Sequence, residues 1–171
     1  MDLKSKIREV PNFPKEGILF YDITTLLKEP VAFQEVIRRL AAPFVGKKIE
    51  KVVAIESRGF IFGAPLAERL GAGLIPVRKP GKLPAEKIEE RYNLEYGSDR
   101  LAIHRDAISS GEKVLIVDDL LATGGTVLTT VNLVKKLGGE IQGVAFVIEL
   151  LGLKGRERLE DLPITSLIVY E

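Results

Sequence analysis

The chain has 171 residues, of which 25 are basic, 24 acidic and 46% apolar, and this length suits one compact domain with a buried core. A formal net charge of +1 supplies no overall field for nucleic acid or an anionic membrane, so we expect neither as a partner. Cysteine is absent and histidine occurs once, which excludes disulfides, thiolate nucleophiles and multi-histidine metal sites and argues against a Ser-His-Asp triad.

The N-terminal segment lacks the basic start, apolar stretch and small-residue cleavage site of a targeting signal. No apolar segment approaches the roughly 20 residues of a membrane span. We therefore expect a soluble, cytoplasmic protein. The remaining inventory of carboxylates, lysines, arginines and backbone amides suits phosphate-sugar chemistry with a hard cation such as Mg²⁺.

Three helices are expected along the chain. Apolar residues recur at the three-and-four spacing of one helix face over residues 31–44, which predicts an amphipathic helix. Further helices are expected over about 60–70 and 126–137, the second ending in a glycine pair as a C-terminal stop should. Pro65 falls inside the earlier of these two and is expected to kink it or to lie in its first turn.

Short runs rich in β-branched residues predict five buried strands, each too short for a helix. They cover residues 51–55, 74–77, 114–117, 144–148 and 167–169. Because strands alternate with helices, the sequence predicts an α/β fold with a mostly parallel open sheet flanked by helices. No repeat or linker divides the chain, so residues 1–171 are expected to form a single domain.

The segment from Lys79 to Asp99 is different, because its prolines, glycines and charges break any core pattern. We expect an exposed arm there, for which a β-hairpin completed by Leu101–His104 is one candidate structure. His104 is expected on the outer face of that strand and is not assigned to catalysis.

The most informative stretch runs from residue 114 to residue 126, where a strand is followed by an acidic pair, a glycine-rich loop and a helix. Ligands of parallel sheets bind beyond the carboxyl ends of the strands, and amides and hydroxyls at a helix start can bind an oxyanion. The two glycines let the backbone approach the oxygens and permit positive φ. The absence of Gly-Lys-Ser/Thr excludes an ordinary P-loop.

The acidic pair, Asp118 and Asp119, would repel a bare phosphate. It makes sense if the ligand also presents hydroxyl groups or a bound metal, and ribose 5-phosphate has that shape. The alternative is that the pair simply ends a strand and that Thr126 caps the following helix.

The acidic pair followed by Ala122–Thr126 resembles the 5-phosphoribosyl 1-diphosphate (PRPP) signature of type I phosphoribosyltransferases. Further segments resemble the adenine branch of that family, so that the resemblance covers nearly the whole length. These segments are Phe13–Pro14, Gly17–Phe20, Asp22–Thr24, Glu56–Phe60, Val77–Pro84, Leu94–Gly97 and Leu153–Gly155. The resemblance implies the type I phosphoribosyltransferase fold, with a small N-terminal hood over about 10–30 and a flexible catalytic arm over about 79–104.

The resemblance implies that adenine and PRPP give AMP and pyrophosphate through a transition state with oxocarbenium character. Asp118 and Asp119 would then contact the ribose hydroxyls and favour the developing positive charge. The 5-phosphate of PRPP, or the phosphate of AMP, would lie in a loop of five residues, Ala122, Thr123, Gly124, Gly125 and Thr126. Mg²⁺ would be held mainly through PRPP, with no certain protein ligand.

The resemblance places pyrophosphate against five residues, Ser57, Arg58, Arg78, Lys79 and Lys82, and gives Arg58 a catalytic role as well. The family often has a cis peptide in the loop that contains Ser57 and Arg58. In the family, the cations corresponding to Arg78, Lys79 and Lys82 lie near the dimer interface, and the resemblance therefore implies a homodimer. From the residues alone, Arg58 could equally be a surface residue, and the later cations could be an ordinary charged loop.

The resemblance assigns Glu95 to proton transfer or hydrogen bonding with adenine. The hood backbone around Leu19, Phe20 and Tyr21 would bind the edge of adenine, with Phe20 and Leu150 on its two faces. Tyr21 stands where the family commonly has Arg. As a residue in a short apolar run, Phe20 could instead be ordinary core, and Glu95 could be a solvent-exposed charge.

Two other functions are compatible with a PRPP-binding fold. A purine- or PRPP-sensing regulator with this fold would usually carry an added DNA-binding domain and a basic face, for which this chain has neither room nor charge. A transferase for a 6-oxopurine would share the PRPP site, but a Lys or Asp side chain typically binds the oxo group there. The hood segment instead resembles the adenine branch.

Overall fold

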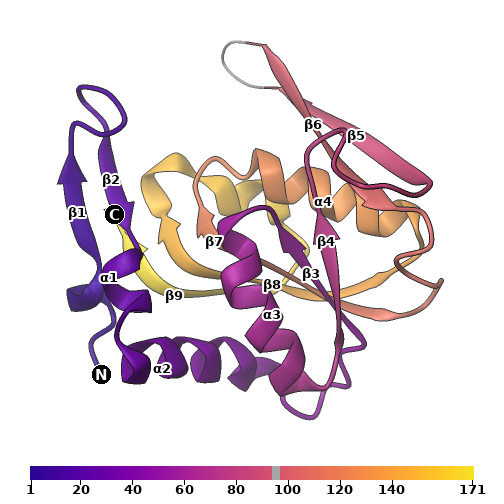
Figure 1. The fold of residues 1–171 in the computed structure, drawn as a ribbon, viewed down its shortest axis with the longest axis horizontal. Coiled ribbons are helices and arrows are strands. Elements are labelled where there is room, and N and C mark those ends of the chain that lie inside the picture. Colours follow the sequence, from indigo (N-terminus) through magenta and orange to yellow (C-terminus); the bar gives the residue numbers. More distant parts are fainter. Residues whose placement is uncertain (94–96) are drawn as a thin grey trace.

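The computed structural model describes residues 1–93 and 97–171 (Figure 1). Its centre is a five-stranded sheet in the order β4-β3-β7-β8-β9, in which every neighbouring pair is parallel. The strands are β3 (Lys51–Ile55), β4 (Gly73–Val77), β7 (Lys113–Leu121), β8 (Glu140–Leu150) and β9 (Ile164–Tyr170). All five predicted strands are confirmed, but β7 and β8 extend well beyond the predicted ends.

The sheet is buried on both faces because its apolar side chains alternate between two cores. On β3, Val52 and Ala54 join the core beneath α1 (Thr24–Leu27), α2 (Pro30–Ala41) and α3 (Arg58–Leu70). Val53 and Ile55 join the core beneath α4 (Gly125–Lys136) on the opposite face. The same period of two continues on β7 and β8. Figure 1 shows α2 and α3 on one side of the sheet and α4 on the other.

The three predicted helices are confirmed as α2, α3 and α4. The predicted end of the first helix, residues 42–44, is a separate 3₁₀ turn, η2 (Ala42–Phe44). Pro65 lies in the middle of α3, so the expectation that it lies in the first turn is wrong. The carbonyl that proline leaves without a donor belongs to Ile61, on an exposed face where water can bind it.

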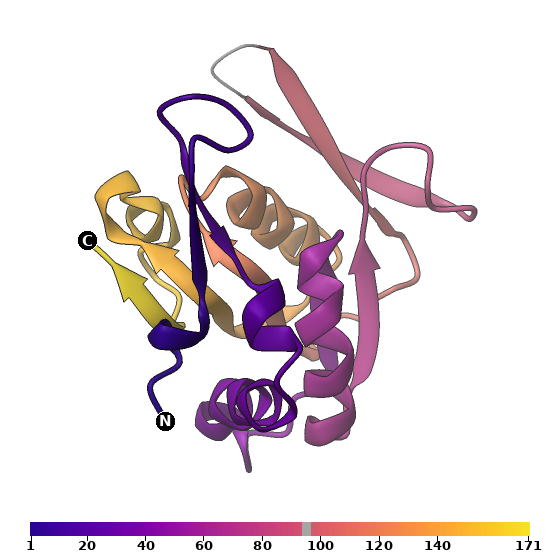
Figure 2. The ribbon, with the colours of Figure 1, turned by 60° about the vertical axis from the view of Figure 1, so that its left-hand side comes forward.

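Two antiparallel hairpins stand at the carboxyl end of the sheet, one on each side (Figure 2). The first pairs β1 (Arg8–Pro11) with β2 (Leu19–Asp22), and the second pairs β5 (Lys87–Asn93) with β6 (Ser98–His104). The second hairpin is only partly exposed, because three residues of β6 from Leu101 to Ile103 are buried in the core beneath α4.

Short 3₁₀ turns complete the described chain: η1 (Lys4–Lys6), η3 (Leu151–Leu153) and η4 (Gly155–Leu159). The last two follow β8 and lead into β9. None of the helices in residues 1–93 and 97–171 combines the length and the apolar character that crossing a membrane requires.

Packing of α3 on the sheet can be tested at Phe62, which is fully buried and contacts Phe33 of α2 edge-on at 6.1 Å between ring centroids. Phe62→Ala should lower the free energy of unfolding by about 3–5 kcal/mol, because it leaves a cavity. Urea unfolding measures the change. Ile61→Ala, at the neighbouring position that is 38% exposed, is the control and should cost about 1 kcal/mol or less. Equal losses for the two variants would contradict this packing.

Candidate active site

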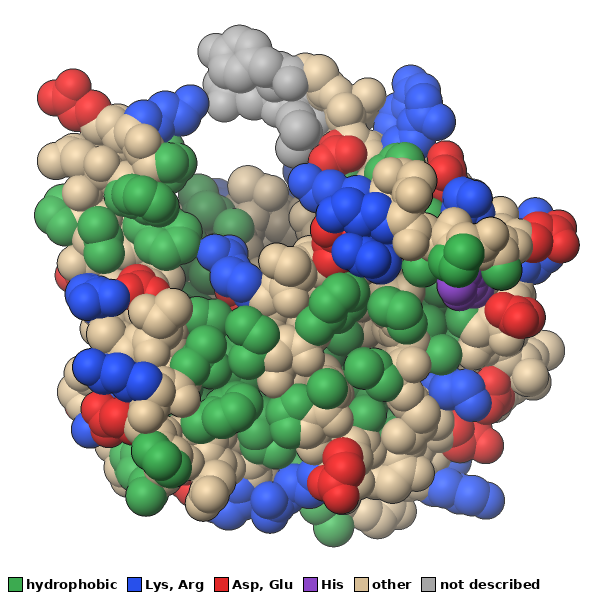
Figure 3. Space-filling view, in the orientation of Figure 1, with side chains coloured by type: hydrophobic (Ala, Val, Ile, Leu, Met, Phe, Trp, Pro, Cys, Tyr) green, Lys and Arg blue, Asp and Glu red, His purple; other side chains and the backbone are tan. Residues whose placement is uncertain are grey.

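The recess at the carboxyl end of the sheet arises because β3 and β7 differ in length. β3 pairs with β7 only as far as Ala54 opposite Val117, whereas β7 continues through Asp118–Leu121, paired with β8 alone. After β3 the chain turns into α3, which leaves that edge of β7 open. Two adjoining cavities of about 190 and 410 Å³ lie here and share Arg58, Asp118, Asp119 and Thr126 as lining residues. The space-filling view shows the molecule hollowed between the two hairpins (Figure 3).

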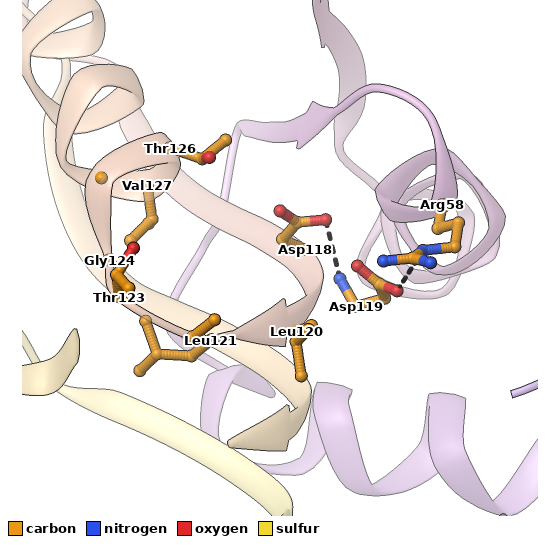
Figure 4. A pocket seen from close by; sticks show the side chains of 11 residues that line it. Arg58, Asp118, Asp119, Leu120, Leu121, Thr123, Gly124, Thr126 and Val127 are labelled. Carbon is orange, nitrogen blue, oxygen red and sulfur yellow. Dashed lines mark hydrogen bonds and ion pairs between the residues drawn. The ribbon is translucent and has the colours of Figure 1, made fainter. Parts of the chain in front are cut away.

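Arg58 and Asp119 form an ion pair at the floor of this recess (Figure 4). Arg58 is the first residue of α3, and its Nε lies 2.7 Å from Oδ2 of Asp119. The Asp119 side chain is 8% exposed and that of Arg58 is 44% exposed, so the carboxylate is buried while the guanidinium borders the open space. The Arg58 guanidinium therefore faces the open space of the recess, above the buried Asp119 carboxylate.

Asp118 points into the space between Arg58 and Thr126 (Figure 4). Its Oδ1 accepts a hydrogen bond of 2.8 Å from the Asp119 N–H and lies 2.9 Å from where a Cβ on Gly59 would be. Only glycine at position 59 allows α3 to approach so closely. Removal from water, followed by the charge of Asp119, raises the pKa of Asp118 well above its usual value.

The glycine-rich loop joins the end of β7 to α4. Gly124 has φ +87° and is the N-cap of α4, which begins at Gly125, so the left-handed conformation predicted for this loop is present. Thr126 lies in the first turn and faces both cavities. Backbone N–H groups of a helix start have no partner within the helix and favour an anion. The loop can therefore bind a phosphate beside the acidic pair.

The loop after β3 contains a cis peptide between Glu56 and Ser57, as the resemblance implies. The Glu56 carboxylate is the common partner of the predicted cations. It accepts hydrogen bonds from Arg78 Nε at 3.3 Å, from the Lys79 N–H at 2.8 Å and from Lys82 Nζ at 2.6 Å. Burial alone would raise the pKa of Glu56, but the bonds from Lys82 and Lys79, with the charge of Arg78, bring it below its usual value.

Sequence reasoning did not identify Glu56 or Tyr92 as site residues, although both line the larger cavity. Tyr92 lies on β5, and its hydroxyl donates to Oδ2 of Asp99 at 3.1 Å. Burial and then the charge of Asp99 raise the pKa of Tyr92 to about 12, so the hydroxyl keeps its proton at neutral pH. Lys79 Nζ lies 3.6 Å from the same Asp99 oxygen. Glu56 could have been found from the sequence, because it begins the Glu56–Phe60 motif. Tyr92 could not, because the sequence shows only that it lies in a charged segment.

The residues expected around adenine divide between two sides of β2. Phe20 contacts Phe13 edge-on at 5.1 Å between centroids, and the Arg58 guanidinium lies 5.6 Å from its ring centroid. Phe20 belongs to neither buried core, so ordinary core packing does not account for it. Tyr21 points the other way, against the ring of Tyr170 at 4.1 Å.

Other predicted site residues lie as follows. Leu19 is 43% exposed on β2, and Leu150 lies at the end of β8, partly buried against the core beneath α2 and α3. Glu95 lies outside the described residues. Among those described, no group of three or more Asp, Glu, His or Cys side chains is arranged to bind a metal ion.

Comparison with known proteins identifies the family. The family model described as phosphoribosyl transferase domain matches residues 23–166. The adenine phosphoribosyltransferase of Acidobacterium capsulatum is 60% identical over 168 residues, covering 98% of this chain and 93% of that protein. The chain belongs to the adenine phosphoribosyltransferase branch of the phosphoribosyltransferase family. The predicted resemblance is thereby confirmed.

Solved structures agree. Adenine phosphoribosyltransferase from Thermoanaerobacter pseudethanolicus matches with a TM-score of 0.95 at 53% identity, covering 99% of this chain and 98% of that chain. The enzyme from Saccharomyces cerevisiae, solved with adenine and D-2,5-dideoxy-2,5-imino-altritol 1,6-bisphosphate, matches with a TM-score of 0.92 at 44% identity, covering 97% and 96%. The predicted type I phosphoribosyltransferase fold is confirmed.

The raised pKa of Asp118 gives a prediction for stability. A carboxyl whose pKa is higher in the folded state than in the unfolded state destabilises the fold when ionised, and that cost disappears as pH falls below the unfolded value of about 3.9. Asp118→Asn should therefore raise Tm at pH 8, by about 2–4 °C per kcal/mol relieved, and the gain should shrink toward pH 4. Scanning calorimetry against pH measures it. Asp106 is exposed, so the control Asp106→Asn should leave Tm nearly unchanged. An Asp118→Asn variant that is no more stable than wild type at pH 8 would contradict the raised pKa of Asp118.

Proposed function

We propose that the recess between β3, β7 and α4 is where this chain converts adenine and PRPP to AMP and pyrophosphate. The reaction itself follows from membership of the family. One observation supports placing it here: the Asp118–Asp119 pair lies between a phosphate-binding helix start and the Arg58 guanidinium. PRPP has the matching order of groups, with a ribose diol between a 5-phosphate and a 1-diphosphate.

The phosphate loop Ala122–Thr126 binds the 5-phosphate through the backbone N–H groups at the start of α4 and the threonine hydroxyls. Asp118 and Asp119 accept hydrogen bonds from the ribose hydroxyls. As the bond to pyrophosphate breaks, positive charge grows on the sugar, and the nearby carboxylates stabilise it. Burial and the charge of Asp119 raise the pKa of Asp118, so its ionised form is disfavoured without a ligand, and a positively charged sugar would favour it.

The pyrophosphate binds against Ser57 and Arg58, with Arg78, Lys79 and Lys82 close by. In the described structure Arg78 and Lys82 are hydrogen-bonded to Glu56, whose side chain is 8% exposed. This carboxylate holds the cations in place until a pyrophosphate, with its greater charge, competes for them. A homodimer, which the resemblance implies, would bring the second subunit's cations near the same group, and light scattering would test it.

The base binds beside Phe20, with its edge against the backbone of Leu19–Tyr21 and its other face toward Leu150. The Tyr21 side chain is turned toward Tyr170, so its contribution is limited to the backbone of β2. Glu95 assists the base by hydrogen bonding or proton transfer as its ring nitrogen bonds to the sugar. PRPP, AMP and pyrophosphate are charged and do not cross membranes unaided, which supports a cytoplasmic location.

A divalent metal, which we take to be Mg²⁺, fits the donors that are present. Mg²⁺ prefers oxygen ligands and usually binds through one or two carboxylates together with substrate phosphates and water. The described residues offer the pair Asp118 and Asp119 but no larger acidic group, so the metal would be held mainly by PRPP. Bound there, it would neutralise charge on the leaving pyrophosphate.

The proposed site is tested by an assay with PRPP, Mg²⁺ and one purine at a time: adenine, hypoxanthine, guanine or xanthine. We expect AMP from adenine alone, resolved by chromatography, and a loss of about 10²–10³-fold or more in Asp118→Asn/Asp119→Asn with its fold intact by circular dichroism. Turnover that survives in the double variant would overturn the site. Product only from an oxopurine would overturn the base site, and PRPP binding without product would favour a regulator.

Glu95 gives a separate prediction. Glu95→Ala should lower the single-turnover rate by about 10²-fold or more while PRPP binding changes little, because general acid-base assistance acts on the chemical step. Glu86→Ala is the control, since Glu86 precedes β5, is 77% exposed at its side chain and pairs only with Arg105 among the described residues. Rapid-quench kinetics measures both variants. An unchanged single-turnover rate in Glu95→Ala would remove this residue from the mechanism.

A further inference from the structure

Glu149 is a buried carboxylate that the proposed reaction does not use. It is 1% exposed, next to the last residue of β8, and pairs in register with Leu121, the residue before the phosphate loop. Two elements donate hydrogen bonds to it. Arg156 of η4 donates from Nε at 2.8 Å and from Nη2 at 2.6 Å, and Ser166 Oγ of β9 donates at 2.8 Å.

The Arg156 bonds bring the pKa of Glu149 below its usual value although burial acts in the opposite direction. A buried carboxylate holds a bidentate arginine in a fixed position, because breaking the pair would leave the buried carboxylate charge without a partner. The ion pair thereby anchors η4 to the end of β8, and Ser166 links the same carboxylate to β9.

The residue before Arg156, Gly155, lies against the back of the phosphate loop. A Cβ on Gly155 would lie 2.4 Å from the Ala122 carbonyl oxygen, 2.9 Å from Leu121 Cδ1 and 3.1 Å from the Gly124 N. A Cβ on Gly124 would in turn lie 2.7 Å from the Gly155 carbonyl oxygen. Glycine at both 124 and 155 allows the two backbones to touch, and the contact prevents either segment from moving closer to the other.

We propose that Glu149, Arg156 and Gly155 are positioning residues that fix the phosphate loop from behind. The ion pair holds η4 in place, and Gly155 of η4 sets how far back Ala122–Gly124 can lie. This inference rests on the proposed function of the loop, and it predicts that disturbing η4 weakens PRPP binding without removing any group that touches PRPP.

The first test compares Gly155→Ala with Gly152→Ala, because a Cβ on Gly152 meets nothing within 4 Å and neither glycine has positive φ. Gly155→Ala should raise the Kd for PRPP, measured by calorimetry, by about tenfold or more, since misplacing a binding group by about 1 Å can cost about 10²-fold. Gly152→Ala should bind as wild type. Equal Kd values for the two variants would overturn the proposal.

The second test covers the outcome that Gly155→Ala fails to fold. Arg156→Lys keeps the charge but loses the bidentate geometry, and Arg156→Ala loses both. The control is Arg38→Ala on α2, which breaks another bidentate pair, with Glu35, away from the site. We expect the Kd for PRPP to rise in the order wild type, Arg156→Lys, Arg156→Ala, with Arg38→Ala at the wild-type value.

A merely structural role for the ion pair would lower Tm in Arg156→Ala and leave the Kd for PRPP unchanged, which would overturn the proposal. The KM for PRPP should rise more than kcat falls, whereas a general loss of folded protein would lower kcat alone. Failure of the proposed site has a different signature, in which the Asp118→Asn/Asp119→Asn variant keeps its turnover. Failure of this inference alone leaves that double variant inactive and the Kd for PRPP unchanged in the Gly155 and Arg156 variants.

Discussion

The unequal length of two adjacent strands is the constraint on which this site depends. β3 pairs with β7 only as far as Ala54, opposite Val117, while β7 runs four residues further with only β8 as a partner. The unpaired edge places Asp118 and Asp119 where water is scarce and leaves room for a ligand. It also requires a cation nearby, and Arg58 supplies one because α3 begins immediately after the turn that ends β3. Close approach of that helix in turn requires glycine at position 59.

Charges in the site are largely compensated among themselves, with one exception. Asp119 is paired with Arg58, and Glu56 with Arg78 and Lys82, so these groups are already oriented before a substrate arrives. Asp118 is the exception, and its raised pKa records the cost. A carboxylate that is poorly compensated in the free protein gains most when positive charge develops beside it, so the feature that destabilises the free protein would favour the proposed transition state.

The sequence predicted the layers of the fold well because the three central strands of the sheet are buried on both faces and each helix shows one apolar face. It placed the end of the central strand at residue 117, since charged residues normally stop a buried strand. Pairing with β8 carried β7 on to Leu121 instead, which is a tertiary effect that local pattern does not contain. Pro65 was expected in a first turn or at a kink. It lies in mid-helix, where the exposed face at Ile61 lets α3 continue past it.

The site was predictable where one segment carries it and not where distant segments meet. Strand, acidic pair and glycine-rich loop are contiguous, so Asp118 to Thr126 could be found by inspection. The capture of Arg78 and Lys82 by Glu56 joins residues more than 20 positions apart.

The contact between Gly124 and Gly155 joins residues still further apart in the chain. A glycine at position 124 has a local explanation in its positive φ, whereas Gly155 has none of that kind. Its requirement lies in the end of β7 and the phosphate loop, because its Cβ would be 2.4 Å from the Ala122 carbonyl oxygen and 2.9 Å from Leu121 Cδ1. A glycine without a local reason is therefore a signal of close approach between two backbones, and here that approach links the end of β8 to the loop after β7.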